Sequence, residues 1–435
     1  MGTDNTKHMP RQTWITVGTA VVVTAIALGT AWAVFKPEGP PLADASFSLT
    51  EITPNADGLT DVTRLTYTLR RPATVSVYFV DTAQRRYDFR RDKPRGTGEA
   101  SVDFGGVVDG YTTRGELVTG KVLARVLADG TYTWVVEAVD ADGVANQITG
   151  TLTVTQAEPA LPDLTLALGP RVFTPNQDGL DDRVQITIGL TKTLAENGLQ
   201  VYLTNAEGTL RLPIAESTTS GRKPGEAGVH EYNYDGGIDL GETPPANGDY
   251  LVLATAEDRV GQRVELSEPL TIAQGGLPRG EIVLGEVTFS SEFVRLDDTL
   301  TFTLTVQNYG SAPLRTTGPE PGYIYSSMAE NYNNTGFLQE SGAFRVGIMC
   351  DTCLNDFPWR WSIGAQSGLT LIPDSQGRPQ YYLEPGGVSV VTGGIVLDQI
   401  VTSRNPQYFW AGLIQEDVAI YNNKADPWLI EISPR

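Results

Sequence analysis

Two short segments of the sequence carry oxygen side chains at a spacing that could hold a hard cation. The first runs Thr-Pro-Asn-Ala-Asp-Gly-Leu-Thr-Asp over residues 53–61, and the second runs Thr-Pro-Asn-Gln-Asp-Gly-Leu-Asp-Asp over 174–182. Each places one amide and two carboxylates around a glycine: Asn55, Asp57 and Asp61, and then Asn176, Asp178 and Asp182. Calcium takes about six to eight oxygen ligands, which such a loop could supply together with backbone carbonyls and water.

The same side chains also fit a purely structural role. Asn and Asp accept hydrogen bonds from nearby backbone N–H groups in Asx turns, and an Asp-Gly pair supplies a positive φ before a strand. Both loops are shorter than an EF-hand loop and lack its bidentate glutamate. We therefore favour the turn, keep calcium as the alternative, and consider magnesium less suitable because it seldom uses an all-protein site.

The chain has two cysteines, Cys350 and Cys353, whose spacing allows three interpretations. A structural zinc site needs four ligands, and the only histidine beyond the N-terminal tail is His230. A redox motif needs a thioredoxin-like βαβ context, which this strand- and turn-like stretch does not offer. We favour a local disulfide that shapes the turn in an oxidising compartment, since so short a loop gains little stability from closure.

Aromatic side chains concentrate after residue 320, around a stretch over 318–344 that is too long for a plain hairpin loop. Three of them are expected at the surface, as residues that bind a ligand or partner: Tyr323, Tyr325 and Tyr332. Four others are expected to fill the core: Phe344, Trp359, Trp361 and Trp410.

Motifs for catalysis are missing from the sequence. With His8 in the N-terminal tail, only His230 could serve a nucleophilic triad, and no G-x-S-x-G, H-E-x-x-H or P-loop motif occurs. A glycosidase that uses two carboxylates needs only Asp and Glu at the right separation, which a sequence does not reveal. We predict that the protein is not an enzyme.

Composition sets the broad class of the protein. A length of 435 residues with 40% hydrophobic and 19% charged residues fits about three domains. The 52 acidic and 32 basic residues give a net charge of −20, which repels phosphate backbones, so a nucleic-acid partner is not expected. The 46 glycines and 27 prolines indicate many turns and therefore many short strands.

An uncharged apolar run over residues 13–35 is long enough to cross a hydrocarbon core of ~30 Å as a helix. Lys7 and Arg11 precede it, which favours a cytoplasmic N-terminus. The alternative is a cleaved signal peptide, since Ala31 and Ala33 offer small residues at a cleavage spacing. We favour the anchor because the run exceeds a usual signal-peptide core; either interpretation places the rest of the chain outside the cell.

The two TPNxDGxxD segments begin a longer internal repeat. Each is followed by residues that alternate as in a half-buried strand, and each repeat closes similarly, with ADGTYTWVVEAVDADG over 128–143 and ANGDYLVLATAEDRVG over 246–261. Strands rich in Val, Thr, Tyr and Leu between regular turn signals are typical of antiparallel sandwiches. The sequence therefore predicts an all-β protein.

These motifs resemble those of known Ig-like domains. The TPNxDGxxD opening with the later GTY and AxDxxG resembles the Ig-like domains of flagellar hook-cap proteins and of surface modules in gliding bacteria, over residues 45–156 and 166–273. Further on, FTLTVQNYGS over 302–311 resembles the VxNxG strand of adhesion-type, CARDB-like Ig domains. The resemblance implies Ig-like folds with roles in assembly scaffolding or surface attachment. Sorting domains stand at the C-terminus of their proteins, so two internal copies argue against a sorting role.

The predicted organisation is a set of tandem Ig-like sandwiches behind one transmembrane helix: tail 1–12, membrane helix 13–35, spacer 36–44, sandwiches 45–157 and 166–273, and an aromatic-rich domain 281–435. We predict a single-pass protein of the cell membrane with its bulk extracellular or periplasmic. Its expected function is structural or binding, with a protein or glycan partner at the envelope. The alternatives are an accessory subunit of an envelope complex, and a carbohydrate receptor or glycan-active enzyme.

Overall fold

The computed structural model describes residues 39–217 and 221–434. Their regular secondary structure is almost entirely β-strand, with three short 3-10 turns at Ile238–Leu240, Gln366–Gly368 and Thr402–Arg404. The prediction of an all-β protein is therefore confirmed. The predicted membrane helix at residues 13–35 lies outside the described residues, and within them no helix has the length and apolar character needed to cross a membrane.

The chain forms two compact units. The first contains residues up to 116 together with 122–161 and 258–263, and the second contains 117–121, 162–257 and 264–435. The division into three domains expected from the sequence stays a prediction.

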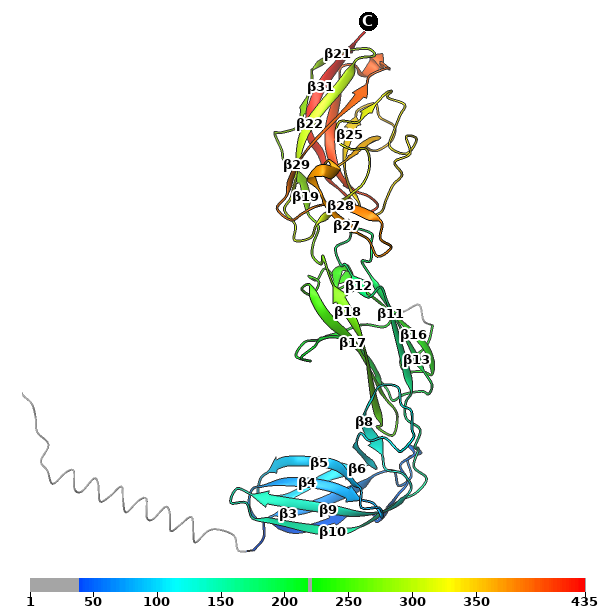
Figure 1. Cartoon of the computed structure of the whole chain (residues 1–435), viewed down its shortest axis with the longest axis vertical. Helices are drawn as coiled ribbons and strands as arrows, with labels where there is room; N and C mark the ends of the chain where they lie inside the picture. Colours follow the sequence, from blue (N-terminus) through cyan, green and yellow to red (C-terminus); the bar gives the residue numbers. More distant parts are fainter. Residues whose placement is uncertain (1–38, 218–220, 435) are drawn as a thin grey trace, which may run out of the picture. The chain divides into compact units, whose positions relative to one another are not determined.

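In the first unit, two sheets enclose one core (Figure 1). One sheet consists of β1 (Leu42–Phe47), β3 (Thr63–Leu69) and β6 (Gly98–Phe104). The other consists of β2 (Glu51–Ile52), β10 (Ala145–Val154), β9 (Gly130–Asp140), β4 (Ala73–Val80) and β5 (Arg86–Arg95). A hairpin is formed by β7 (Val107–Asp109) and β8 (Lys121–Val126). Apolar and polar residues alternate along β3, so every second side chain enters the core, where Phe79 stacks on Phe104 at 4.4 Å between centroids.

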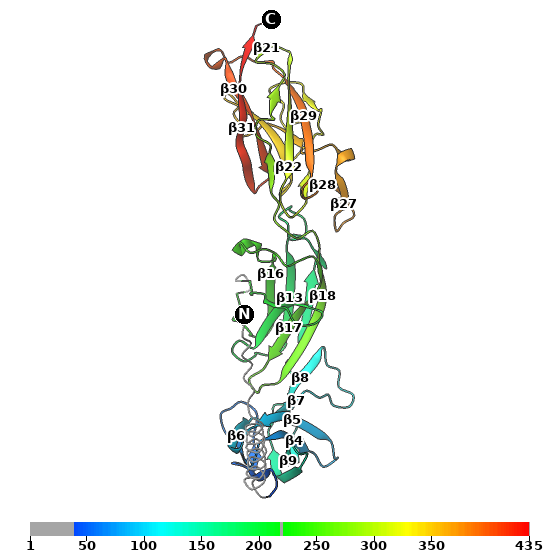
Figure 2. The same cartoon turned by 90° about the vertical axis from the view of Figure 1, so that its left-hand side faces the viewer.

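The second unit begins with another pair of sheets (Figure 2). The first of these consists of β11 (Leu164–Gly169), β13 (Val184–Leu190) and β16 (Gly228–Tyr234). The other contains β15 (Arg211–Pro213), β14 (Leu199–Asn205), β17 (Gly248–Glu257), β18 (Arg263–Ile272) and β12 (Val172–Phe173). The order of β11, β13 and β16 corresponds to that of β1, β3 and β6, and β12 runs parallel to β18 as β2 does to β10.

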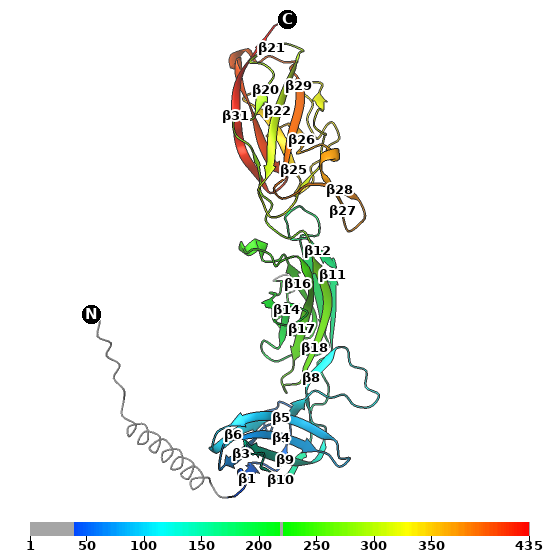
Figure 3. The same cartoon turned by 60° about the vertical axis from the view of Figure 1, so that its left-hand side comes forward.

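The C-terminal region, residues 280–433, contains two larger sheets that share one core (Figure 3). One sheet consists of β19 (Gly280–Ile282), β22 (Thr299–Asn308), β29 (Val388–Val396), β24 (Ile324–Tyr325) and β20 (Thr288–Phe289). The other consists of β21 (Phe293–Arg295), β31 (Ala419–Ser433), β30 (Gln407–Gln415), β25 (Phe344–Cys350), β23 (Leu314–Thr316), β28 (Pro379–Leu383), β27 (Thr370–Pro373) and β26 (Trp359–Ser362). The expected burial of Phe344, Trp359 and Trp361 is observed, whereas Trp410 is only half-buried, with the Lys424 ammonium 4.5 Å from its ring centroid.

Candidate functional site

The first TPNxDGxxD loop is held by hydrogen bonds from its own backbone. Oδ1 of Asp61 accepts the N–H of Asn55 at 3.0 Å, and Oδ2 of Asp61 accepts the N–H of Gly58 at 2.7 Å. Oδ1 of Asp57 accepts the N–H of Leu59 at 2.7 Å. These are the hydrogen bonds of the turn that the sequence favours.

The second loop has the same backbone hydrogen bonds. Asp182 accepts the N–H groups of Asn176 and Gly179, at 3.1 and 2.6 Å, and Asp178 accepts the N–H of Leu180 at 2.8 Å. Among the described residues, no group of three or more His, Cys, Asp or Glu side chains is placed to hold a metal ion. Calcium binding at the two loops therefore stays the untested alternative to a purely structural turn.

The two loops differ in what surrounds them. Asp57 is exposed, and its Oδ2 accepts the side-chain N–H of Asn55 at 3.1 Å. Asp178 is only 2% exposed, and its Oδ2 accepts the hydroxyl hydrogen of Tyr382 at 3.0 Å instead. The side-chain nitrogen of Asn176 is buried and has no hydrogen-bond partner among the described residues.

The second loop lies against the C-terminal region of the same unit. Nε of Arg315 donates to the backbone oxygen of Asp178 at 2.8 Å, and Nε2 of Gln415 donates to the backbone oxygen of Gln177 at 2.7 Å. Arg315 also donates to the backbone oxygen of Ser341 at 2.7 Å. These contacts attach the turn before β13 to strands β23, β28 and β30.

Burial changes the pKa of two carboxyl groups in this loop. It raises the pKa of Asp178 to about 6, and the neighbouring Asp182 carboxylate adds to the effect. Burial also raises the pKa of Asp182, although backbone N–H groups partly offset the rise. The loop therefore carries carboxyl groups that favour the protonated state more than exposed ones do.

The tyrosines that we expect at the surface lie mostly inside the C-terminal region. Tyr325 is 0% exposed, and its hydroxyl donates to the backbone oxygen of Arg360 at 2.9 Å. Tyr332 is 9% exposed, and its ring lies 3.9 Å from the guanidinium carbon of Arg360. Tyr323 is half-buried and meets Tyr325 edge to face. The expectation of exposed tyrosines is therefore wrong for Tyr325 and Tyr332.

A buried ionic network explains this burial. The Glu416 carboxylate pairs with Arg360 at 2.5 Å and with Arg345 at 3.4 Å, and all three side chains are nearly inaccessible to solvent. Arg345 also donates to the backbone oxygens of Phe337 and Leu338. The long segment that contains the tyrosines is thus attached to β25 and folds over it, which covers Tyr332.

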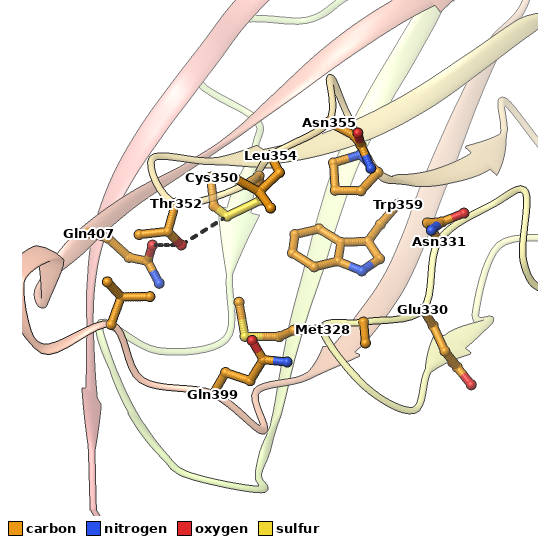
Figure 4. A pocket seen from close by; sticks show the side chains of 14 residues that line it. Met328, Glu330, Asn331, Cys350, Thr352, Leu354, Asn355, Trp359, Gln399 and Gln407 are labelled. Atoms are coloured by element: carbon orange, nitrogen blue, oxygen red, sulfur yellow. Dashed lines mark hydrogen bonds between the residues drawn. A yellow bond between two sulfur atoms is a disulfide. The ribbon is translucent and has the colours of Figure 1, made fainter.

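A pocket of about 320 Å³ opens in the C-terminal region (Figure 4). Its size lies within the range of roughly 300–1,000 Å³ that is common for small-molecule sites. Its lining includes Met328, Cys350, Cys353, Trp359, Gln399 and Gln407.

A disulfide between Cys350 and Cys353 forms one wall of this pocket. The Thr352 hydroxyl, inside the same turn, donates to Oε1 of Gln407 at 2.6 Å and so ties the turn to β30 (Figure 4). The wall is therefore fixed both covalently and by a hydrogen bond to the neighbouring strand.

The indole of Trp359 lies beside this turn and Met328, with its nitrogen directed toward the segment that carries Met328 and Glu330 (Figure 4). The side chain is 1% exposed, and its Nε1 has no hydrogen-bond partner among the described residues. Buried N–H groups are normally paired, so an unpaired one beside a cavity indicates a place for an acceptor.

The pocket has little charge. Glu330 is the one ionisable side chain among its 14 lining residues, and both of its oxygens accept hydrogen bonds from Ser326, at 2.6 and 2.7 Å. The lining therefore lacks the pair of carboxylates that a glycosidase needs.

His230, the residue considered above for a catalytic triad, is fully buried in β16. Its Nδ1 lies 2.6 Å from Oε1 of Glu216, and its Nε2 lies 2.7 Å from the backbone oxygen of Glu226. Both ring nitrogens are thus engaged within the protein.

Comparison with known proteins gives no family assignment. No protein-family model and no curated protein matches the chain. One similar solved structure is a Ca²⁺-stabilised adhesin that helps an Antarctic bacterium reach out and bind ice, with 14% identity, a TM-score of 0.25, and 91% of this chain and 75% of that one covered. Another is part of a 1.5-MDa bacterial ice-binding adhesin, with 12% identity, a TM-score of 0.22, and 91% and 99% covered.

A third is a DUF4785 family protein from Legionella pneumophila, with 12% identity, a TM-score of 0.23, and coverage of 88% of this chain and 85% of that one. These TM-scores are too low for the likenesses to support an argument about function. The candidate site therefore rests on the geometry of the chain itself.

Sequence reasoning missed most of the pocket. Met328 and the stretch that holds Gln399 and Gln407 are distant in the sequence from the Cys350–Cys353 turn, and no local pattern marks them. The available signal was the nearness of Trp359 to the Cys350–Cys353 turn.

Proposed function

We propose that this chain is a non-catalytic binding protein of the cell surface, and that the pocket beside Trp359 holds its ligand. The observation that carries the proposal is the buried, unpaired indole N–H of a side chain that lines a cavity large enough for a small ligand. A wall fixed by the Cys350–Cys353 disulfide supports the proposal, because a preformed pocket loses less freedom when it binds.

The proposed location is the outer side of the cell membrane, with residues 13–35 as a single-pass anchor and the N-terminus cytoplasmic. The uncharged length of that run supports the anchor. The Cys350–Cys353 disulfide supports an oxidising compartment for the remainder of the chain.

The β-sandwich strands that precede the C-terminal region are proposed to present it. The hydrogen bonds from Arg315, Tyr382 and Gln415 to the loop at residues 176–179 support this role, because they hold the end of one pair of sheets against the next. Such a joint limits bending between consecutive β-assemblies.

The test is a binding screen with the full-length chain against glycan, peptide and envelope-extract arrays. Ala329 is an exposed residue of the pocket rim, so Ala329→Trp should block entry without disturbing the core. Ala83→Trp, at an exposed turn of the first unit, is the matched control. The proposal predicts ligands that bind the native chain and the control but not Ala329→Trp; ligands retained equally by Ala329→Trp contradict it.

The same preparation addresses the alternative of an accessory subunit. Stoichiometric companions that co-purify with the native protein and with Ala329→Trp alike would favour a subunit of an envelope assembly. Recovery of the chain without companions would agree with a free binding protein.

A further inference from the structure

We infer that the ligand of the pocket is a neutral sugar that carries an N-acetyl group; this inference rests on the proposed function. It follows from three properties of the pocket: its unpaired donor, its charge, and the distribution of apolar and amide groups along its wall.

The unpaired donor distinguishes Trp359 from other tryptophans of the same region. The indole N–H of Trp361 donates to the backbone oxygen of Tyr323 at 3.0 Å, and that of Trp428 donates to Val287 at 3.2 Å. Among the tryptophan side chains that the structure describes, that of Trp359 is the one whose indole N–H is both buried and without a partner. A buried donor left unpaired is unfavourable, so the ligand is expected to bring an acceptor to it.

The charge of the pocket lining indicates which kind of acceptor the ligand brings to the Trp359 N–H. No lysine or arginine lines the pocket, one carboxylate, that of Glu330, is present, and the chain carries a net charge of −20. A carboxylate or phosphate ligand would therefore enter against repulsion. A cationic ligand would bring no acceptor and would find a single aromatic ring, that of Trp359. The remaining acceptor is an uncharged carbonyl or hydroxyl oxygen.

The side chains of the pocket wall favour one class of uncharged ligand. Beside the indole lie the Met328 thioether and the disulfide, which together form a soft apolar surface that suits a methyl group (Figure 4). The amide side chains of Gln399 and Asn355 lie at the exposed rim, and amides both donate to and accept from hydroxyls. An acetamido group supplies a carbonyl oxygen and a methyl together, and a sugar ring supplies hydroxyls for the rim.

The test compares two probes that differ in their acetamido groups, triacetylchitotriose and cellotriose. Calorimetric titration uses the full-length chain in a detergent without a sugar headgroup. We expect the acetylated probe to bind about tenfold tighter, the difference that one added hydrogen bond provides. Trp359→Phe should remove that advantage, so that the two probes bind with similar affinity. Trp428→Phe is the matched control, because Trp428 lies outside the pocket lining, and it should bind like the native chain.

A second variant covers the case in which Trp359→Phe fails to fold. Gln399 is exposed, so Gln399→Ala should preserve the fold and weaken the acetylated probe severalfold through lost hydroxyl contacts. Equal affinity for the two probes, or no effect of either variant, would overturn the inference. If Ala329→Trp blocks a peptide or another ligand while neither sugar binds, the inference fails and the proposed function stands; if it blocks nothing, both fail.

Discussion

The hydroxyl of Tyr382 donates a hydrogen bond to Oδ2 of Asp178 at 3.0 Å, although 204 positions separate the two residues in the sequence. Tyr382 belongs to β28 of the C-terminal region, and Asp178 belongs to the turn before β13. In the other copy of this turn, the equivalent oxygen of Asp57 accepts a hydrogen bond from Asn55 instead. The loop with Asp57 is therefore held by its own residues, whereas the loop with Asp178 also makes a contact with a strand far away in the sequence.

Removing this hydroxyl should destabilise the second unit. In Tyr382→Phe, the buried Asp178 oxygen loses its partner, and an unpaired buried acceptor costs about 1–3 kcal/mol. Tyr250→Phe is the control, because its hydroxyl makes an exposed hydrogen bond to Ala246, and its loss should cost less than about 1 kcal/mol. Urea unfolding measures both variants, and equal losses would contradict a special role for Tyr382.

The raised pKa of Asp178 predicts a particular pH dependence. Its folded pKa is about 6, above the ordinary value of 3.8, so its contribution to stability is fully present below about pH 4 and is lost as pH rises through 6. The loss is on the order of 3 kcal/mol. Asp178→Asn should remove most of this loss of stability with rising pH. Asp57→Asn, in the exposed copy of the loop, should show the same dependence of stability on pH as the native chain. The measurement is the urea midpoint of each variant between pH 4 and 8. If the midpoint of Asp178→Asn still falls as pH rises, the pH dependence does not come from Asp178.

Equivalent glycines in the two loops should respond differently to substitution. Gly58 and Gly179 have similar φ angles, +86° and +84°, so alanine brings similar backbone strain to both, about 1–2 kcal/mol. A Cβ on Gly58 would meet nothing within 4 Å, whereas one on Gly179 would lie 2.1 Å from the backbone oxygen of Ser341. Gly179→Ala should therefore lower the free energy of unfolding by about 1–3 kcal/mol more than Gly58→Ala. Similar losses in chemical denaturation would show that the second loop does not pack as described.

The Glu416 network should hold the long segment over β25. Glu416→Gln removes the negative charge between Arg345 and Arg360, and breaking a buried pair of this kind costs about 3–5 kcal/mol. Because Tyr332 stacks on Arg360, we also expect faster hydrogen exchange around residues 326–337. Asp103→Asn, which breaks an exposed pair with Arg64, is the control and should leave that exchange unchanged. Unchanged exchange in Glu416→Gln would contradict the proposed support.

Calcium should have little effect on thermal stability. The carboxylates of both loops accept backbone N–H groups, and a metal would have to displace these hydrogen bonds. We expect the melting temperature to be the same with millimolar calcium, with magnesium and with a chelator. A rise that is specific to calcium and absent from Asp57→Asn would instead establish the metal site.

The β-architecture could be predicted because its signal is local. Residues 63–69 alternate between buried and partly exposed positions, and the same alternation is visible in the sequence as Leu65, Tyr67 and Leu69 between polar residues. The burial of Tyr332 could not be predicted in this way. It depends on Arg360 in β26 and Glu416 in the turn after β30, which are distant in the sequence and form a buried ionic network that composition does not reveal.

The candidate pocket shows the same limit. The Cys350–Cys353 turn is visible in the sequence, but Met328, Gln399 and Gln407 reach it only through the fold. Similarly, the two TPNxDGxxD loops look alike as sequences. Only the structure shows that Asp178 is buried against Tyr382 while Asp57 faces solvent.

Methionine NMR shows directly whether a ligand enters the pocket beside Trp359. The chain has four methionines, of which Met328 lines the pocket and Met349 lies on β25, where its sulfur accepts the N–H of Phe357. The full-length chain, labelled at the methionine methyl groups, is titrated with a ligand from the array screen. We expect the Met328 resonance to shift in a saturable manner while that of Met349 stays in place. Saturable binding with an unmoved Met328 resonance would contradict the pocket as the binding site.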